Sequence, residues 1–597
     1  MFSTKMGSVK GANIQTLQEI ASSELRDLLR ELEGPKDLFI DEELMTPLNH
    51  IAGATLIRQM GVAKMFKLGS INPENAVQEN RVFLAHSEMV NAKFVADHVR
   101  EDMKARRKRR YLLICVPRKT SLMEMVLEQE GVHGRVQVCE WALELIPFDT
   151  DVMSMERPRF HSRVFVEGDQ TWLHDVASSL ISLQMLFGTI PTVYGVGKYS
   201  KMVAEMVEFM TEGEPPVVPS EGRKIDALIL MDRSCDYVTP LCSQVTYQGI
   251  LDDVFKIKSG FLDLEPSVTG KDGPVKLLLN SAADSVFADI RDMHFVSVFG
   301  KLQKKAKELQ SSYSRGKSSE SVQEMKKFVQ ELGGLKKQHQ SLAIYIAACE
   351  AINNFKTSQN FEQTLRIEHL LLENLEEKTC LDLIEELIHR QGSLIVPLRL
   401  LCLYSQTENG IRPKTLQSLR HQFLQTHGYH HLSTFYNLKR AGLLVEQGDQ
   451  KGSYHALRRR LQLVPKGGDQ YDLQNPIDMA YVFGGAYSPI SCRLVEEVLR
   501  HGGWLGLEEV TRHVPEEPFA RAFIQSARAN TSRGLPTAVS LGGLPKVTLI
   551  YFIGGCSYSE VSALRFLAHQ LGVTFYIATT HFVNFESLVE SAIEKDK

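Results

Sequence analysis

A glycine pair followed by a lysine is the stretch whose residue types come closest to phosphate chemistry. It reads Gly195-Val196-Gly197-Lys198. A phosphate-binding loop needs GxxxxGK followed by Ser or Thr, because backbone N–H groups cradle the phosphates and the hydroxyl holds Mg²⁺. The first glycine and the hydroxyl are both missing, since Thr192 and Tyr199 stand at those positions. We predict a turn that leads into the helix after Tyr199, and a nucleotide- or phosphate-dependent α/β enzyme remains the alternative.

Carboxylates and histidines form two further groups that could do chemistry. Asp149 and Asp151 follow an apolar run, as a nucleophilic carboxylate and a Mg²⁺ ligand would in phosphoryl transfer, but no matching lysine or further acid accompanies them. A histidine cluster contains the i, i+3, i+4 spacing of zinc ligands, without a Cys or acid at matching spacing. Its members are His421, His427, His430 and His431. We predict no catalytic residue, no cofactor and no metal.

The strongest charge run is Lys104–Arg110, which reads KARRKRR. Such a run could bind acidic lipid, nucleic acid or an import receptor. It could also be the solvated end of a helix, because cations favour helix C-termini. The whole chain has 68 Lys and Arg against 72 Asp and Glu, a net charge of −4. A general nucleic-acid binder would carry a basic excess, so we predict no nucleic-acid partner.

Composition indicates a large globular protein of the cytoplasm. Of 597 residues, 43% are hydrophobic and 23% are charged, which suggests about three or four domains. Nine dispersed cysteines without a CxxC pair are typical of reduced thiols. The first residues lack the apolar region of a signal peptide, and no apolar run approaches the roughly 20 residues that span a bilayer. If the protein works at a membrane, we expect partners to hold it there.

Strands and helices alternate through the first part of the chain. We predict strands at 81–86 and 111–116, and helices at 87–103 and 121–130. A further helix is expected to begin at Thr46-Pro47, an N-cap followed by proline. This alternation is typical of a mostly parallel sheet covered by helices. We assign the first α/β domain to residues 1–146.

A second α/β domain is predicted to be split by a helical insertion. Its two parts are residues 147–264 and 473–597. We expect a strand at Met479–Phe483, and Gly484-Gly485 would form a tight turn from this strand into the next helix. The insertion, residues 265–472, would contain a helical hairpin at about 294–356 with a polar tip at 314–321. Ser281 to Asp284 fits a capping box before its first helix.

Three motifs recur in the order known from one family. They are DRSCDYVTPL at 232–241, YVFGG at 481–485 followed by Pro489 and Arg493, and FIGG at 552–555 followed by SEVSALR at 559–565. Together they resemble the Sec-one/Munc-eighteen (SM) family over the whole chain. Scaffolding roles are expected for Asp232, Arg233, Asp236, Pro240, Gly484, Gly485, Gly554, Gly555, Glu560 and Arg565.

The resemblance implies a fold, a function and partners. The fold is an arch of two parallel-sheet α/β domains and an all-α insertion. The function is not enzymatic: such proteins bind SNAREs and promote their assembly for membrane fusion. KDLFIDEELM at 36–45 and AYVFGGAYSPISCR at 480–493 resemble the vacuolar-sorting thirty-three branch, and its B-type paralogue most. The connection 446–453 is shorter than in that paralogue.

The thirty-three branch implies a setting and two contact surfaces. It acts in tethering complexes, peripheral on late endosomes, lysosomes or recycling endosomes, and the B-type pairs with a VIPAR-type adaptor. The hairpin would offer a surface on which two SNARE helices align before zippering. The candidate SNARE contacts on it are Lys301, Lys304, Lys305, Lys307, Lys326 and Lys327. Candidate adaptor contacts are Arg420, Tyr429 and Leu432.

Overall fold

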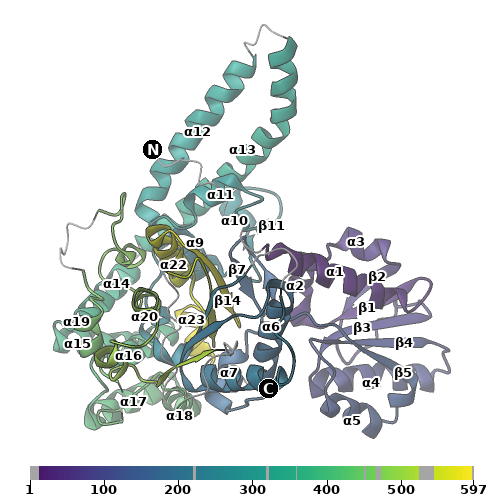
Figure 1. Cartoon of the computed structure of the whole chain (residues 1–597), viewed down its shortest axis with the longest axis horizontal. Coiled ribbons are helices and arrows are strands. Elements are labelled where there is room, and N and C mark those ends of the chain that lie inside the picture. Colours follow the sequence, from purple (N-terminus) through teal and green to yellow (C-terminus); the bar gives the residue numbers. More distant parts are fainter. Residues whose placement is uncertain are drawn as a thin grey trace. The chain divides into compact units, whose positions relative to one another are not determined.

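The computed structural model describes residues 13–218, 224–317, 322–357, 359–449, 452–465, 472–522 and 544–594. The chain forms two compact units, Asn13–Glu156 and Arg157–Lys597. Each has its own sheet (Figure 1). The part of the chain described here contains no helix that is both long and apolar enough to cross a membrane.

The first unit is a parallel α/β sandwich. Its strands lie in the order β2-β1-β3-β4-β5, all parallel. Their bounds are β1 Lys36–Ile40, β2 Val62–Lys67, β3 Asn80–His86, β4 Arg110–Val116 and β5 Val136–Glu140. The helices are α1 Gln15–Arg30, α2 Glu42–Ile51, α3 Ala54–Gln59, α4 Met89–Lys104 and α5 Ser121–Gln129. The central strands β1, β3 and β4 are almost wholly buried, as strands covered on both faces are.

One expectation for this unit needs correction, and a second agrees with the structure. The helix expected to have Thr46 as its N-cap is α2, which begins five residues earlier because the Asp41 carboxylate caps it, accepting the Glu43 N–H at 3.2 Å. Pro47 therefore lies inside α2. Asp149 and Thr150 lie in the turn between β6 Ile146–Pro147 and β7 Val152–Ser154, an antiparallel pair. The sequence favoured a turn or a connection between domains at this place over phosphoryl transfer, and the structure has a turn here.

The second unit has a sheet in which β12-β8-β9-β13-β14 are neighbours. The strands are β8 Thr192–Val196, β9 Ala227–Asp232, β12 Pro518–Ala522, β13 Val547–Ile553 and β14 Thr574–Thr579. All are parallel except the edge strand β12. Neighbouring helices are α6 Trp172–Phe187, α7 Lys198–Met210, α9 Tyr247–Phe255, α20 Ile490–His501, α22 Tyr558–Leu571 and α23 Phe585–Glu590.

Helices make up most of the chain between residues 285 and 460. They are α11 Ser285–Ile290, α12 Phe295–Lys317, α13 Val322–Lys356, α14 Gln359–Leu372, α15 Glu377–His389, α16 Ile395–Thr407, α17 Pro413–His427, α18 Leu432–Arg440 and α19 Tyr454–Arg460. An antiparallel pair that the sequence did not predict, β10 Phe261–Leu264 and β11 Val275–Leu278, comes before them. Asp284, not Ser281, caps α11, since its carboxylate accepts the Val286 N–H at 2.9 Å.

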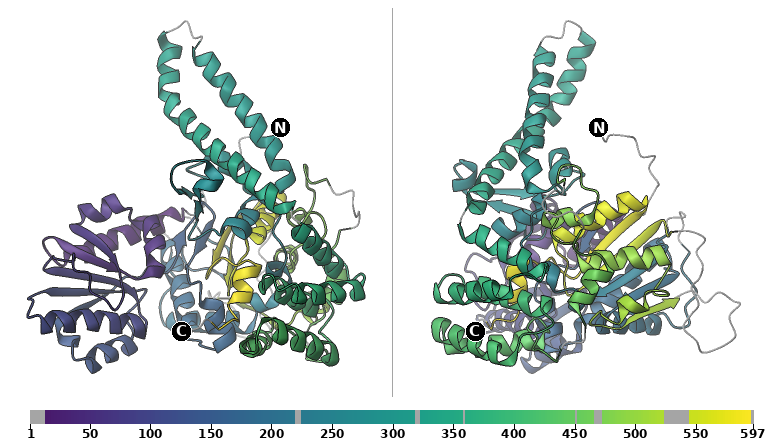
Figure 2. Two further views of the ribbon diagram at one scale, coloured as in Figure 1. Left: turned by 180° about the vertical axis from the view of Figure 1, so that it is seen from behind. Right: turned by 90° about the vertical axis from the view of Figure 1, so that its left-hand side faces the viewer.

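Helices α12 and α13 lie side by side as a hairpin that extends away from the other helices of the unit (Figures 1 and 2). The buried side chains of Leu302 and Leu309 on α12 belong to one core cluster with Leu342 and Tyr345 on α13. This packing fixes the base of the hairpin, because long helices gain most of their stability from a packed face. The predicted tip, 314–321, falls partly outside the described residues.

Candidate functional site

The carboxyl ends of β8, β9 and β13 bring the sequence motifs together. Parallel pairing sets Val196 beside Met231, and Ile553 beside Asp232. The residues that follow these strands therefore meet at one edge of the sheet. In open α/β sheets this edge is where ligands bind. Here it is filled by the chain's own charged side chains.

Asp232 occupies the place that a bound phosphate would take at the start of α7. Its carboxylate accepts the N–H groups of Tyr199 and Ser200, each at 2.7 Å, and the Ser200 hydroxyl at 2.6 Å. Gly197 has φ +122°, and a Cβ there would lie 2.2 Å from Asp232 Cγ. Burial raises the pKa of Asp232 to about 7, against the lowering effect of these hydrogen bonds. Gly195 therefore lies in β8, and Gly197 alone makes the turn into α7, a helix whose anion site is already occupied.

Arg233 and Glu560 form a fully buried ion pair between the first and third motifs. Two guanidinium nitrogens donate to the two Glu560 oxygens at 2.8 and 3.0 Å, and a further bond reaches the Gly555 carbonyl at 3.2 Å. Glu560 also accepts the Ser557 N–H at 2.8 Å in a capping box that begins α22. Burial alone would raise the pKa of Glu560, but the neighbouring guanidinium outweighs it and holds that pKa low. Bidentate pairing of this kind fixes geometry as well as charge.

Asp236 connects the second motif to the same cluster. Its carboxylate accepts the Thr239 N–H at 3.0 Å, the Thr239 hydroxyl at 2.6 Å and the Ser491 N–H at 3.0 Å. Ser491 Oγ in turn donates to Glu560. Pro240 lies in the short turn Val238–Leu241, all of it buried. One hydrogen-bonded network thus connects the regions of all three motifs through Arg233, Asp236, Thr239, Ser491, Ser557 and Glu560. Together with Asp232, the residue before Arg233 in the chain, we call these residues the motif cluster.

Gly554 and Gly555 let the motif cluster pack closely against the end of β13. Their φ values are +97° and +112°, and a Cβ would lie 2.5 Å from Phe165 and 2.3 Å from Val583. Gly484 and Gly485 also have positive φ, but the segment before them, Met479–Phe483, is a 3₁₀ helix and not the expected strand. Arg565 lies apart from the cluster and donates to Asp292 at 2.9 Å.

A second buried network, which the sequence did not reveal, joins the helical part to the α/β part of the same unit. Arg399 on α16 pairs with Glu368 on α14 and donates to the Ser243 hydroxyl at 3.1 Å and the Leu241 carbonyl at 3.2 Å. Its guanidinium stacks 4.0 Å from the centre of the Phe585 ring. The signal was present: Arg399 is a single charge in the apolar run IVPLRLLCLY, and lone buried charges need partners.

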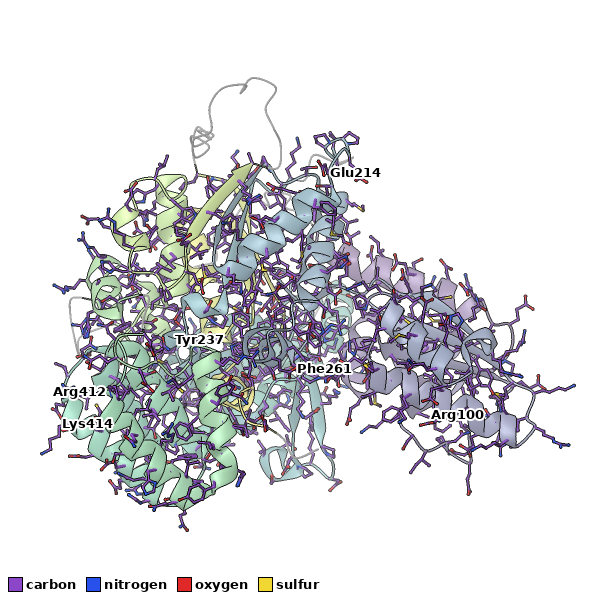
Figure 3. The ribbon with its side chains drawn as sticks, turned by 90° about the horizontal axis from the view of Figure 1, so that it is seen from below. Arg100, Glu214, Tyr237, Phe261, Arg412 and Lys414 are labelled. Atoms are coloured by element: carbon purple, nitrogen blue, oxygen red, sulfur yellow. The ribbon has the colours of Figure 1, made fainter. Side chains whose placement is uncertain are left out.

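Acid is expected to weaken the second unit through His161. The ring is buried against Ser591 Oγ (2.8 Å) and the Tyr237 hydroxyl (3.3 Å), and Tyr237 lies within the body of the unit (Figure 3). Burial, with the nearby charges of His581 and Arg233, lowers the pKa of His161 to about 3. An unfolded histidine takes up a proton below about pH 6.5 while His161 stays neutral, so stability is lost as pH falls from 6.5 towards 3.

Urea unfolding at pH 7.5 and 5.5 measures this effect. Between these pH values the unmodified chain should lose about 1.4 kcal/mol more unfolding free energy than the His161→Asn protein. The same change at the exposed His421 serves as the control and is expected to leave the loss as it is. An unchanged pH profile in the His161→Asn protein would show that this ring is not the group responsible.

The candidate lysines of α12 divide into two kinds. Lys301, Lys304 and Lys307 are exposed, and at 100° per residue they cover an arc of about 120°. Lys305 instead turns to Asp289, with Nζ 3.2 Å from Oδ2. Val296 and Phe299 on the same helix are 66% and 61% exposed. We call Val296, Phe299, Lys301, Lys304 and Lys307 the α12 face. Lys326 and Lys327 belong to α13, but their side chains lie outside the described part.

The candidate adaptor residues lie on successive elements, α17, the 3₁₀ turn Tyr429–His431, and α18. Tyr429 and Leu432 are 65% and 54% exposed, and Arg420 is half-buried. Tyr436, also 65% exposed, follows Leu432 by one helical turn and was missed by the sequence reasoning. Spacing of i, i+3, i+7 could have revealed it, because such residues share a helix face. Tyr429, Leu432 and Tyr436 form what we call the tyrosine face.

The histidine cluster packs against aromatic rings. The Phe423 ring centre lies 4.5 Å from that of His427 and 5.8 Å from that of His431. Burial lowers the pKa of both histidines. Among the described residues no group of three His, Cys, Asp or Glu side chains could hold a metal ion. All nine cysteines are free thiols.

Comparison with known proteins gives one family across the whole chain. A sequence model of the Sec1 family matches residues 36–591. Vacuolar protein sorting-associated protein 33B of Danio rerio is 42% identical over 614 residues, covering 97% of each chain. The human protein of that name is 41% identical over 610 residues, with 97% of each chain covered. Rat vacuolar protein sorting-associated protein 33A is 35% identical over 602 residues, with 98% of each covered.

Solved structures match the fold. The Unc18–syntaxin 1 complex from Monosiga brevicollis aligns with a TM-score of 0.61 at 17% identity, covering 98% of this chain and 100% of that one. The SM protein Vps45 in complex with the Qa SNARE Tlg2 aligns with a TM-score of 0.58 at 15% identity, covering 96% and 97%. The predicted fold class, two parallel-sheet α/β parts with a helical insertion, is confirmed.

Proposed function

The chain belongs to the Sec1 family, and from this premise we propose that it binds SNARE proteins and promotes their assembly when endosomal and lysosomal membranes dock and fuse. The observation that carries the proposal is the full-length relationship to vacuolar protein sorting-associated protein 33B at 42% identity. The predicted thirty-three branch, with a closer likeness to the B-type than to the A-type, is confirmed by 42% against 35% identity. In the solved structures, Unc18 is in complex with syntaxin 1 and Vps45 with the Qa SNARE Tlg2.

The α12 face supports the proposal physically. Three exposed lysines beside two exposed apolar side chains suit an amphipathic helix with acidic flanks, which is the chemistry of a SNARE segment. Holding two such helices in register on a fixed surface removes part of the ordering cost that disordered segments meet when they pair. Incubating the purified chain with soluble SNARE segments and measuring the rate of bundle formation tests this. An unchanged rate at saturating chain would contradict it.

The tyrosine face is the surface we assign to a VIPAR-type adaptor or another tethering-complex subunit. Exposed aromatic side chains on adjacent turns are typical anchors of protein interfaces. Through such a partner the chain would be peripheral on late endosomes, lysosomes or recycling endosomes.

The division into domains 1–146, 147–264 with 473–597, and 265–472 belongs to the same proposal. Of the short connection 446–453, residues 450 and 451 lie outside the described part.

Replacing Tyr429 by Ala is expected to weaken adaptor binding about tenfold, because an interface aromatic contributes more than about 1 kcal/mol. Tyr436→Ala, which sequence reasoning alone would not suggest, is expected to have a similar effect. The affinity for the purified adaptor provides the measurement. The matched control is the exposed Phe209→Ala on α7, which should bind as the unmodified chain does. Full affinity in both tyrosine variants would move the adaptor to another surface.

The anion site at the start of α7 is already occupied, and this favours a regulatory role over an enzymatic one. The Asp232 carboxylate takes the N–H groups that would hold a phosphate at the start of α7. Calorimetry with ATP and Mg²⁺ should therefore give no binding heat. Saturable binding would favour the nucleotide-dependent enzyme that the sequence left open.

A further inference from the structure

The basic run 104–110 divides into cations that face inward and cations that face solvent. Asp102 on α4 is fully buried and pairs with the buried Arg81, the largely buried Arg109 and the half-exposed Arg107. Its carboxylate lies 3.1 Å from Arg81, 3.3 Å from Arg107 and 3.4 Å from Arg109, and accepts the Tyr111 hydroxyl at 3.1 Å. One buried anion thus fixes both ends of the loop between α4 and β4.

Backbone bonds fix the middle of the loop. Arg106 has φ +53°, an uncommon value for a residue with a side chain, and its N–H donates to the Met103 carbonyl at 3.1 Å. The next N–H, of Arg107, donates to the Asp102 carbonyl at 2.9 Å. The turn therefore holds a single conformation while it displays its outward side chains.

Besides Arg110, which is exposed and donates to the Glu33 carbonyl at 3.3 Å, three cations lie on the outside of this turn. Lys104, Arg106 and Lys108 are exposed, and none forms an ion pair with any described residue. Arg100, one turn earlier on α4, differs: its guanidinium is paired with Asp97 and Glu130 (Figure 3). Between Lys93, which is exposed near the start of α4, and the turn, no further Lys or Arg of the helix is therefore without an ion pair.

Exposed apolar side chains flank these cations. Met103 precedes Lys104 and is 40% exposed. Val77 is 65% exposed and follows Ala76, whose carbonyl accepts from Arg109 at 3.1 Å and Arg81 at 3.3 Å. The buried arginines thus join the Val77 loop to the basic turn. We call Val77, Met103, Lys104, Arg106 and Lys108 the basic turn face.

We propose that the basic turn face binds the anionic phospholipid surface of a membrane, so that the chain itself contacts the bilayer in addition to any partner that recruits it. Cations attract acidic headgroups, and adjacent apolar side chains enter the boundary between headgroups and acyl chains. A nucleic-acid surface would be expected to interleave aromatic side chains for stacking on bases. The basic turn face has none, and the chain as a whole is acidic by four charges.

Vesicle co-sedimentation of the full chain tests the proposal. Vesicles of phosphatidylcholine with phosphatidylserine should bind the chain, vesicles of phosphatidylcholine alone should not, and salt should weaken binding by screening. The variant Lys104→Gln/Arg106→Gln/Lys108→Gln should bind roughly 100-fold more weakly, since each cation contributes about a fivefold gain near an anionic surface. Arg100→Gln, on the same helix but already paired, is the matched control and should bind normally.

A second variant separates a membrane from other acidic partners. Met103→Ser keeps every charge and should still weaken vesicle binding several-fold, because it removes an apolar contact. Inorganic phosphate at matched charge should not compete, since the surface recognises an array of headgroups. Equal vesicle binding by the triple variant and the unmodified chain would overturn the proposal, and so would unchanged vesicle binding by Met103→Ser. A third contrary result is an unmodified chain that binds single-stranded RNA but no vesicles, with the RNA binding lost in the triple variant.

Discussion

Replacing Glu560 by Ala is expected to lower the free energy of unfolding by about 3–5 kcal/mol, the cost of leaving a buried charge without its partner. The charge is that of Arg233, which is 1% exposed and donates to both Glu560 oxygens. The same change also removes the capping box at the start of α22 and the acceptor of Ser491 Oγ. Denaturant unfolding followed by circular dichroism measures the difference.

Two further variants show whether the unpaired charge causes the loss. Glu386→Ala breaks a solvent-exposed pair with Arg390 and should cost between about 0 and 1 kcal/mol. Glu560→Leu combined with Arg233→Met removes both charges and should be less destabilising than Glu560→Ala alone, because Arg233 is no longer a buried cation without Glu560. Asp236, 3.7 Å from Arg233, keeps its hydrogen bonds from Thr239 and Ser491 in this variant. A loss below about 1 kcal/mol in Glu560→Ala would mean that the motif cluster does not hold this unit together.

Reversing three charges on the α12 face is the second change with a large expected effect. Lys301→Glu, Lys304→Glu and Lys307→Glu together should weaken SNARE binding about 100-fold, because attraction becomes repulsion and like charges at an interface cost several kcal/mol. Since all three side chains are exposed, the fold should stay intact. The dissociation constant for a soluble SNARE segment is measured at low and at physiological salt, and the loss should shrink as salt rises.

The control for this change lies on another exposed helix. Arg412 and Lys414 at the start of α17 lie at the outer edge of the second unit in Figure 3, and reversing both leaves the α12 face as it was. This variant should bind SNARE segments normally. Equal weakening in both variants would point to overall charge as the cause, and unchanged binding in the triple variant would remove the α12 lysines from the SNARE site.

The regular α/β pattern was predictable because buried parallel strands are apolar runs and their helices carry clear periodicity. Strands β1, β3, β4 and β13 are of this kind. Strand β2 was missed: it reads VAKMFK and is largely exposed at the sheet edge, so it lacks the apolar run. The edge strand β12 was missed for the same reason, since all its residues are only half-buried. Local sequence cannot reveal a strand whose pairing partner supplies its stability.

The motifs predicted which residues matter but not how they meet. Arg233 and Glu560 are 327 positions apart, and only the register of β9 against β13 places them together. That Asp232 would cap α7 follows likewise from the pairing of β8 with β9. Lys305 was a reasonable candidate by charge, yet its contact with Asp289 depends on the packing of α11 against α12. Long-range pairing of this kind is set by the whole fold and leaves little trace in local composition.

The most direct test of the central claim is the equilibrium binding of the unmodified chain, with its adaptor if the two co-purify, to soluble Qa-SNARE and R-SNARE segments of endosomal membranes. We expect saturable binding to the segments, a faster rate of four-helix bundle formation when the chain is present, and loss of both in the Lys301→Glu/Lys304→Glu/Lys307→Glu protein. Absence of binding to every such segment, by a chain whose unfolding curve shows that it is folded, would contradict it.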